Sequence, residues 1–303
     1  MIASALQAFQ DASLRTERDV SLAERTSFRI GGKADLWVTP DSEDGICLAA
    51  EICTANEIPF FVIGKGSNLL ADDDGFRGCV LSTENCTECR VNGTGVHASA
   101  GVSLTGLAVT VCNAGLSGFS FAYGIPGTVG GALLMNAGAY GGETADVVTS
   151  VFCYDPVEGT RLTLSREACE FGYRSSVFQK RNLIILGADF RLSPGNPEKI
   201  REEMKDYLQR RKDKQPLEYP SAGSVFRRYP GTYTSKLIDE AGLRGFQIGD
   251  AQVSEKHAGF IVNRGHATSA EVRQLISVIR DEIKRRFGID IVCEIRTIPQ
   301  TEL

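Results

Sequence analysis

The sequence has no apolar run near the ~18 residues that a membrane-spanning helix requires. Its first basic residue is Arg15, so its start lacks the positively charged segment that opens a secretory signal peptide. It has 33 Lys and Arg against 38 Asp and Glu, a net charge of -5, and no strongly basic region of the kind that marks nucleic-acid binding. These absences predict a cytoplasmic protein with no membrane insertion and no nucleic-acid partner.

Metal-binding patterns are also missing. The chain has only 3 His and no H-E-x-x-H motif. Cys86 and Cys89 form a C-x-x-C pair, but no second pair or close His pair completes a zinc site. The 9 Cys are scattered, mostly in apolar segments where a free thiol behaves as a small hydrophobic group. We therefore predict no metal.

Familiar nucleotide and nucleophile motifs are incomplete. Gly64 and Gly66 begin a G-x-G-x-x-G pattern, but Leu69 occupies the third glycine position, and no P-loop is present. Residues 222–226 resemble a G-x-S-x-G nucleophile elbow but lack the second glycine. A bound dinucleotide would therefore be held by a fold other than the Rossmann fold.

The 303 residues, 42% of them hydrophobic and 23% charged, are sufficient for two or three domains with a sizeable core. Periodicity and end signals predict a series of helices and strands in the first two thirds of the chain. The predicted elements are a strand at 34–38, a helix capped by Asp41 or Ser42 and running to about Asn56, a strand at 60–63, a helix at 104–113 stopped by Gly115, and strands at 147–154 and 183–192.

The last third of the sequence is predicted to contain two long helices. The helix at 198–214 has alternating charges, which indicate a solvated face. The second helix begins at a capping box of Thr268 and Glu271 and stops at Gly288. A final strand is predicted over 289–295.

Glycine gathers in three clusters, Gly31-Gly32, residues 64–68 and residues 124–142. Glycine allows the backbone to approach a ligand closely, so that amide groups form a nest for a phosphate. Tight turns without a ligand are the simpler explanation of any single cluster, but three clusters within one half of the chain weaken that explanation.

Four polar side chains are candidates for chemistry. Arg174 stands beside glycine and aromatic residues in a setting suited to a planar carboxylate, and Ser224 stands in a loop of small residues that could present it to a ligand. Taken alone, each string is explained more simply as an ordinary loop. Glu294 interrupts an apolar segment, either on a solvated face or as a site residue. His257 lies in a loop-like stretch, where a solvated, substrate-facing or buried position is possible.

Many strings of residues, in order along nearly the whole chain, resemble the UDP-N-acetylenolpyruvoylglucosamine reductase family of bacterial cell-wall synthesis, in its shorter second type. They lie at residues 26–32, 64–70, 125–131, 136–141, 171–175, 214–218, 221–226, 236–243 and 257–263. The sequence departs from the family pattern at Cys293, where the family usually has proline.

The resemblance implies an α+β protein with an FAD-binding fold of the vanillyl-alcohol-oxidase (PCMH) type in two subdomains, followed by an α+β substrate-binding domain. The expected boundaries are residues 1–75 with 290–303 for the first FAD-binding subdomain, 76–213 for the second, and 214–289 for the substrate-binding domain. The protein is expected to be monomeric.

The resemblance also implies that FAD is the cofactor, NADPH the co-substrate and a sugar nucleotide the substrate. The expected cofactor-binding residues are Arg29, Gly64, Lys65, Gly66, Ser67, Asn68, Leu69, Ile125, Pro126, Gly127, Thr128, Gly130, Gly131, Asn136 and Gly138. The expected substrate-binding residues are Tyr140, Arg228 and His257.

The family's catalytic residues match Arg174, Ser224 and Glu294. Hydride addition to C3 of the enolpyruvyl ether moves charge through C2 into the carboxylate. Arg174 and a protonated Glu294 are expected to stabilise that charge, and Ser224 to protonate C2. Two other functions stay open: a related FAD oxidase that uses oxygen, and a flavin- or nucleotide-binding module without catalysis.

Overall fold

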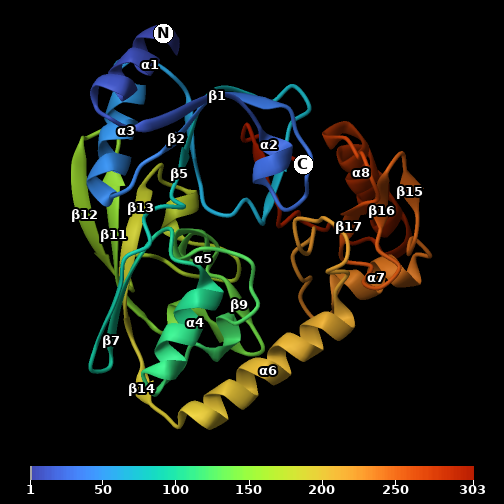
Figure 1. Cartoon of the computed structure of the whole chain (residues 1–303). Coiled ribbons are helices and arrows are strands. Elements are labelled where there is room, and N and C mark those ends of the chain that lie inside the picture. Colours follow the sequence, from blue (N-terminus) through green and yellow to red (C-terminus); the bar gives the residue numbers. More distant parts are fainter. Residues whose placement is uncertain (1) are drawn as a thin grey trace. The chain divides into compact units, whose positions relative to one another are not determined.

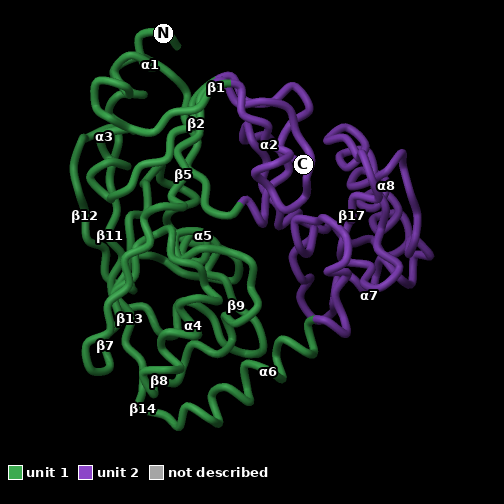
Figure 2. Tube along the Cα trace, viewed as in Figure 1, with its two compact units in different colours: residues 1–18, 36–65, 78–211 green, residues 19–35, 66–77, 212–303 purple. Residues whose placement is uncertain are grey.

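The computed structural model describes residues 2–303, and the chain divides into two compact units. Unit 1 contains residues up to 18, 36–65 and 78–211, and unit 2 contains residues 19–35, 66–77 and 212–303 (Figures 1 and 2). The chain passes from one unit to the other within β1 (Arg15–Ser21), β2 (Lys33–Thr39), β5 (Phe76–Ser82) and α6 (Pro197–Lys214), and after Lys65.

Unit 1 is built around an antiparallel sheet with the strand order β12-β11-β13-β7-β6. β3 pairs in parallel with β5 in a second sheet, whose order is β1-β2-β5-β3. The other elements of unit 1 are α1 (Ile2–Asp11), α3 (Glu43–Ala55), β3 (Phe60–Ile63), β6 (Cys89–Asn92), β7 (Gly95–Ser99), α4 (Leu104–Asn113), β8 (Leu116–Ser117), α5 (Val129–Met135), β9 (Gly138–Ala139), β10 (Gly142–Glu143), β11 (Val148–Asp155), β12 (Thr160–Ser165), β13 (Ile184–Arg191) and β14 (Ser193–Pro194).

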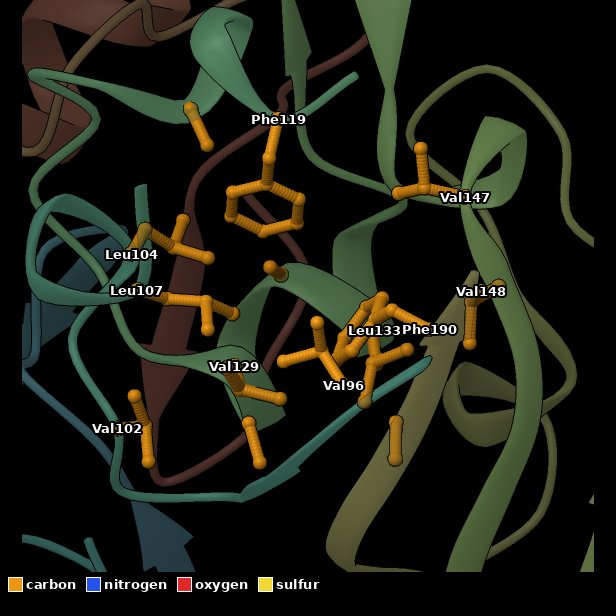
Figure 3. Close-up of a cluster of buried hydrophobic side chains, with 14 of the residues drawn as sticks. Val96, Val102, Leu104, Leu107, Phe119, Val129, Leu133, Val147, Val148 and Phe190 are labelled. Carbon is orange, nitrogen blue, oxygen red and sulfur yellow. The ribbon is translucent and has the colours of Figure 1, made fainter. Parts of the chain in front are cut away.

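The main core of unit 1 joins α4 and α5 to the five-stranded sheet. Figure 3 shows Leu107 of α4, Leu133 of α5 and Phe190 of β13 within one cluster of buried side chains, with Phe119 beside them. A second cluster packs α1 and α3 against β2 and β5, through Phe9, Leu36, Ile46 and Leu81 among others. The sheet and helices thereby fix α5, whose N-terminus carries several of the predicted cofactor residues.

Unit 2 contains a small antiparallel sheet, β15-β16-β17, and a parallel pair, β4 with β18. Its elements are α2 (Leu22–Arg25), β4 (Leu69–Ala71), α7 (Thr234–Glu240), β15 (Gln247–Ile248), β16 (Ala251–Val253), β17 (Ile261–Asn263), α8 (Ser269–Phe287) and β18 (Arg296–Ile298). Its core packs the apolar face of α8 against Leu70 of β4 and Val225.

Most of the predicted elements are confirmed, with ends that differ by one or two residues. α3 begins after Ser42, whose hydroxyl accepts a hydrogen bond from the Gly45 N–H at 3.0 Å. α4 spans the predicted residues, and Gly115 follows it with a φ of 70°. α8 has the predicted capping box of Thr268 and Glu271, and it ends at Gly288 in the left-handed conformation.

The strand predicted over 289–295 is wrong. Only Cys293 of that segment forms a bridge, with Phe226, and Ile295 lies at a bend. The regular strand is β18, which starts at Arg296 and pairs in parallel with β4. The apolar pattern continues across the bend because the segment changes its pairing partner there, which a period of two residues cannot reveal.

No helix in the described part of the chain, residues 2–303, is both long enough and apolar enough to cross a membrane.

The packing of α4 predicts a clear difference between two substitutions on that helix. Leu107 is 1% exposed, so Leu107→Ala leaves a cavity and should reduce the free energy of unfolding by ~2–5 kcal/mol. Val109 is 40% exposed, and Val109→Ala should change it by less than ~0.5 kcal/mol. Urea unfolding of both variants measures the difference, and equal losses would contradict this assignment of the core.

Candidate active site

The predicted cofactor residues of unit 1 meet where β3 ends and α5 begins. A Cβ atom placed on Gly64 would lie 2.4 Å from the Oγ1 of Thr128, so these two strings are in direct contact. Thr128 is the N-cap of α5, and its Oγ1 accepts a hydrogen bond from the Gly131 N–H at 3.4 Å. Lys65, the next residue after Gly64, is exposed.

Backbone hydrogen bonds hold the loop before α5 in place. The Ile125 N–H donates to the Ala122 carbonyl at 3.1 Å, and the Gly127 carbonyl accepts from the Leu104 N–H at 3.1 Å. Pro126 lies between them. At the start of the helix, the Gly130 N–H donates to the Ala100 carbonyl at 2.9 Å.

The predicted cofactor residues of unit 2 begin at Gly66, which has a φ of 58°. A Cβ atom there would lie 2.6 Å from the Arg25 carbonyl oxygen. The Ser27 N–H donates to the Gly66 carbonyl at 3.2 Å, which ties the loop to residues 26–29. Arg29 has a φ of 56° and an exposed side chain. Ser67 and Asn68 are half-buried, and the buried Leu69 starts β4.

These residues fit a group that carries phosphates. Gly64 and Gly66 are positions where a side chain would collide, as expected where the backbone approaches another group closely. The Thr26 hydroxyl is buried beside Gly66, and it has no hydrogen-bond partner among the described residues. The strings 64–69 and 125–131 contain no acidic residue that would repel a phosphate.

Arg174 is held in a tight turn of unit 1. Its φ is 52°, a left-handed conformation that is unfavourable for a residue with a side chain. Gly172 and Ser175 close the turn with two backbone hydrogen bonds of 3.0 and 3.1 Å. The guanidinium donates to the Gly138 carbonyl at 3.1 Å and to the Asn136 carbonyl at 3.5 Å. Arg174 is therefore positioned by its backbone and by its contacts.

Asn136 links α5 to this turn. It is 1% exposed and ends α5 in the left-handed conformation. Its side-chain nitrogen donates to the Gly172 carbonyl at 3.1 Å, and its side-chain oxygen accepts from the Ala145 N–H at 2.9 Å. Both polar groups of the amide are thus used to position the loops of Arg174 and Gly138.

Tyr140 is stacked on Tyr207 of α6, with the ring centres 4.4 Å apart and the planes at 8°. Its hydroxyl donates to the Tyr207 carbonyl at 2.9 Å. Arg211, one turn further along α6, lies close enough for its charge to interact with Tyr140 and packs beside Gly124. Burial lowers the pKa of the Arg211 guanidinium. Arg211 is thus half-buried, whereas most of the other charged residues of α6 are exposed, as the predicted solvated face requires.

Ser224 and Glu294 lie on adjacent segments of unit 2. The Glu294 N–H donates to the Val225 carbonyl at 2.7 Å, and Ser224 forms a bridge with Phe260 on the other side. Both Ser224 and Glu294 are half-buried. Cys293 is a neutral thiol at neutral pH, because burial raises its pKa to about 11.

The remaining predicted residues of unit 2 are Arg228 and His257. The Arg228 guanidinium lies 4.4 Å from the centre of the Tyr233 ring. The Nδ1 of His257 accepts a hydrogen bond from the Gly259 N–H at 3.1 Å, which leaves the proton of the neutral ring on Nε2. Burial lowers the pKa of His257, and the Arg244 charge acts in the same direction.

Within unit 1 the structure thus brings together Gly64 with Thr128, and Arg174 with Asn136 and Gly138. Within unit 2 it brings together Gly66 with Ser27, and Ser224 with Glu294. Sequence reasoning missed Arg211 because the alternating charges of α6 concealed its burial. No group of three or more His, Cys, Asp or Glu in residues 2–303 is arranged to hold a metal ion.

Comparison with known proteins covers both halves of the chain. Residues 215–298 match the C-terminal domain of UDP-N-acetylenolpyruvoylglucosamine reductase, and residues 34–165 match the FAD binding domain. The reductase of Caldanaerobacter subterraneus subsp. tengcongensis is 46% identical over 277 residues, 91% of each chain. The chain belongs to the UDP-N-acetylenolpyruvoylglucosamine reductase family.

Two further matches support this membership. The UDP-N-acetylenolpyruvoylglucosamine reductase of Lachnoclostridium phytofermentans is 46% identical over 283 residues, 91% of each chain. The crystal structure of the reductase from Thermus caldophilus superposes with a TM-score of 0.81 at 32% identity, covering 94% of this chain and 99% of that one. The predicted family, the α+β fold with its FAD-binding domain and FAD as the cofactor are confirmed.

The contact of Gly64 with Thr128 predicts the effect of a single added methyl group. Gly64→Ala should weaken FAD binding on the order of 10- to 100-fold, because overpacking at such a site costs roughly 1–3 kcal/mol. Gly172→Ala is the control, since its Cβ would meet only Ser175 at 3.9 Å. Titration with FAD measures both affinities. Unchanged FAD binding by Gly64→Ala would contradict the proposal that residues 64–69 bind the cofactor.

The environment of His257 predicts a pH dependence of stability. The unfolded ring, with its ordinary pKa of 6.5, binds a proton more readily than the folded ring. Stability should therefore decrease as the pH falls from about 6.5 toward the lowered pKa of the folded state. In His257→Asn the stability should decrease less over this pH range, because the variant has no ring to protonate at this position. Thermal unfolding between pH 5 and 8 measures it, and parallel curves for wild type and variant would refute the assignment.

Proposed function

We propose that this chain uses NADPH and FAD to reduce the enolpyruvyl ether of UDP-N-acetylglucosamine to UDP-N-acetylmuramate, a step in peptidoglycan precursor synthesis. The family membership supports a flavin-dependent oxidoreductase with this substrate. Within the structure, the hydrogen bond from the Glu294 N–H to the Val225 carbonyl carries the assignment, because it holds Glu294 beside residues 221–226, the loop that contains Ser224.

FAD, when bound, would supply the hydride-transfer chemistry, with NADPH as the source of the hydride and C3 of the substrate as its acceptor. The residues at Gly64, Gly66 and Thr128 would hold its phosphates through backbone and hydroxyl groups. The remaining task of the protein is to bind the enolpyruvyl group, to stabilise the negative charge that develops on it and to deliver a proton to C2.

Arg174 binds the carboxylate of the enolpyruvyl group in this proposal. When hydride reaches C3, negative charge spreads through C2 into that carboxylate. A guanidinium already held in position stabilises this charge without a reorganisation cost during the reaction. The strained φ of 52° at Arg174 is consistent with such a preset group.

Ser224 donates its proton to C2, and the resulting alkoxide is reprotonated from solvent. A serine hydroxyl is a weak acid, but a carbanion-like C2 is basic enough to take its proton. Glu294, protonated, adds a hydrogen bond to the charged carboxylate. The half-buried positions of Ser224 and Glu294 allow both to reach a ligand.

The sugar nucleotide is held by Arg228, His257 and Tyr140. Arg228 contributes a fixed positive charge for the diphosphate, and neutral His257 contributes the N–H of its Nε2. Tyr140, a residue that is 40% exposed, presents its stacked ring to the nucleotide or sugar.

We also propose that the enzyme acts as a cytoplasmic monomer and, through peptidoglycan supply, in cell shape and division. The three domains are assigned to residues 1–75 with 290–303, 76–213 and 214–289. An oxygen-dependent FAD oxidase or a non-catalytic flavin-binding module is disfavoured, because the family match includes the reductase-specific C-terminal domain.

The assignment of Ser224 predicts a selective defect. Reduction of the bound flavin by NADPH should proceed as in wild type in Ser224→Ala. Its reoxidation by the enolpyruvyl sugar nucleotide should slow by ~10²–10⁴-fold, the usual contribution of a general acid. Ser221→Ala, in the same loop, is the control and should reoxidise normally. Anaerobic stopped-flow absorbance resolves the two steps, and normal reoxidation of Ser224→Ala would contradict the role of this hydroxyl.

A further inference from the structure

Arg296 is a charged residue of unit 2 that the assignments above leave without a function. It is the first residue of β18 and lies opposite Leu69 in the parallel pair with β4. Its N–H donates to the Asn68 carbonyl at 3.0 Å. The Asn68 side chain donates in turn to the Glu294 carbonyl at 3.3 Å. Arg296 therefore lies beside Asn68, near the end of the proposed cofactor-binding residues 64–69, and two residues after Glu294.

Several arginines of unit 2 are paired with a carboxylate, whereas Arg296 is not. Arg77 is paired with Asp35 at 2.7 Å, Arg244 with Asp239 at 2.6 Å, and Arg273 with Asp72 at 3.7 Å. Within residues 2–303, the Arg296 side chain takes part in no hydrogen bond or ion pair. It is nevertheless half-buried, and burial lowers its pKa with no nearby carboxylate to oppose the effect.

A half-buried cation loses part of its hydration, and without a hydrogen-bond or ion-pair partner that loss is not replaced. Such groups persist in folded proteins mainly where they serve a bound ligand. A positive charge in this position is suited to an anion that binds beside Asn68 and Leu69.

Three anions are available if the proposed function holds. The phosphates of FAD are assigned to the glycine strings, whose backbone allows close approach. The substrate carboxylate is assigned to Arg174, which is already oriented in its turn. The third is the negative charge that the flavin ring carries at neutral pH once it has been reduced, and no other residue has been assigned to it.

We propose that Arg296 is a further cofactor-binding residue, whose guanidinium neutralises the negative charge of the reduced flavin ring. This inference rests on the proposed function only in its use of FAD. Arg296 would bind the reduced cofactor more tightly than the oxidised one, because only the reduced ring carries this charge. The consequence is a raised midpoint potential, which favours acceptance of hydride from NADPH.

The test is the midpoint potential of holoenzyme, measured anaerobically by equilibration with reference dyes and without any sugar nucleotide. Arg296→Met should lose at least tenfold in the preference for reduced over oxidised FAD, which lowers the potential by about 30 mV or more for a two-electron couple. Arg296→Lys, which keeps the charge, should retain most of the potential. Arg77→Met, at an exposed arginine of the same unit, should leave it unchanged.

Two outcomes would overturn the inference. An equal loss of affinity for oxidised and for reduced FAD would assign Arg296 to the phosphates of FAD. An unchanged potential with a raised KM for the sugar nucleotide would assign it to the substrate. If Arg296→Met is isolated without FAD, separate titrations with oxidised and reduced FAD give the two dissociation constants. Their ratio is the preference for reduced over oxidised FAD. Because the sugar nucleotide is absent, a different substrate for the enzyme would not change the expected shift in potential.

Discussion

The hydrogen bond from the Glu294 N–H to the Val225 carbonyl is the interaction on which the proposed chemistry of unit 2 depends. It joins the end of the chain to the serine loop, residues 221–226. Two residues later the same segment becomes β18 and pairs with β4, the strand that begins at Leu69, the last of the proposed cofactor-binding residues 64–69. One short stretch of backbone thus connects Glu294 and Ser224, the two proposed catalytic residues of unit 2, with the proposed cofactor-binding residues 66–69. Buried Val225 fixes this stretch in the core of the unit.

Unit 1 positions Arg174, its proposed catalytic residue, by a different device. Arg174 and Asn136 both adopt left-handed conformations, and their side chains bind the backbone of each other's loops. Strained positions of this kind cost on the order of 1–3 kcal/mol each and are kept where the surroundings define them firmly. The large core around α4, α5 and the sheet supplies that support. The result is a guanidinium held in one orientation by the protein itself, as its proposed role requires.

The sequence predicted the long, regular elements well because each carries its own end signals. The Ser42 cap of α3 and the Thr268–Glu271 box of α8 are local features that need no tertiary context. The segment 289–295 was mistaken for a strand because its apolar pattern spans a bend where the pairing partner changes. The half-buried position of Arg211 was not predicted because it depends on the fold of the glycine-rich segment, which approaches its side chain at Gly124.

The candidate site likewise combines residues that local sequence patterns predict with contacts that those patterns do not. Residue types and motif order indicated Arg174, Ser224 and Glu294, but not the Asn136 amide that organises the Arg174 loop, nor the contact of Gly64 with Thr128. These contacts join segments more than 30 residues apart, and local patterns contain no information about them. The lack of a partner for Arg296 is likewise visible only once the whole of its surroundings is known.

The visible spectrum of the purified holoenzyme under anaerobic conditions tests the central claim most directly. The account predicts that NADPH bleaches the flavin band and that the enolpyruvyl UDP-sugar restores it with no air present. Return of the band only when oxygen is admitted would contradict the assignment as a reductase. A protein that binds no flavin, even when FAD is added, would contradict both the cofactor and the function.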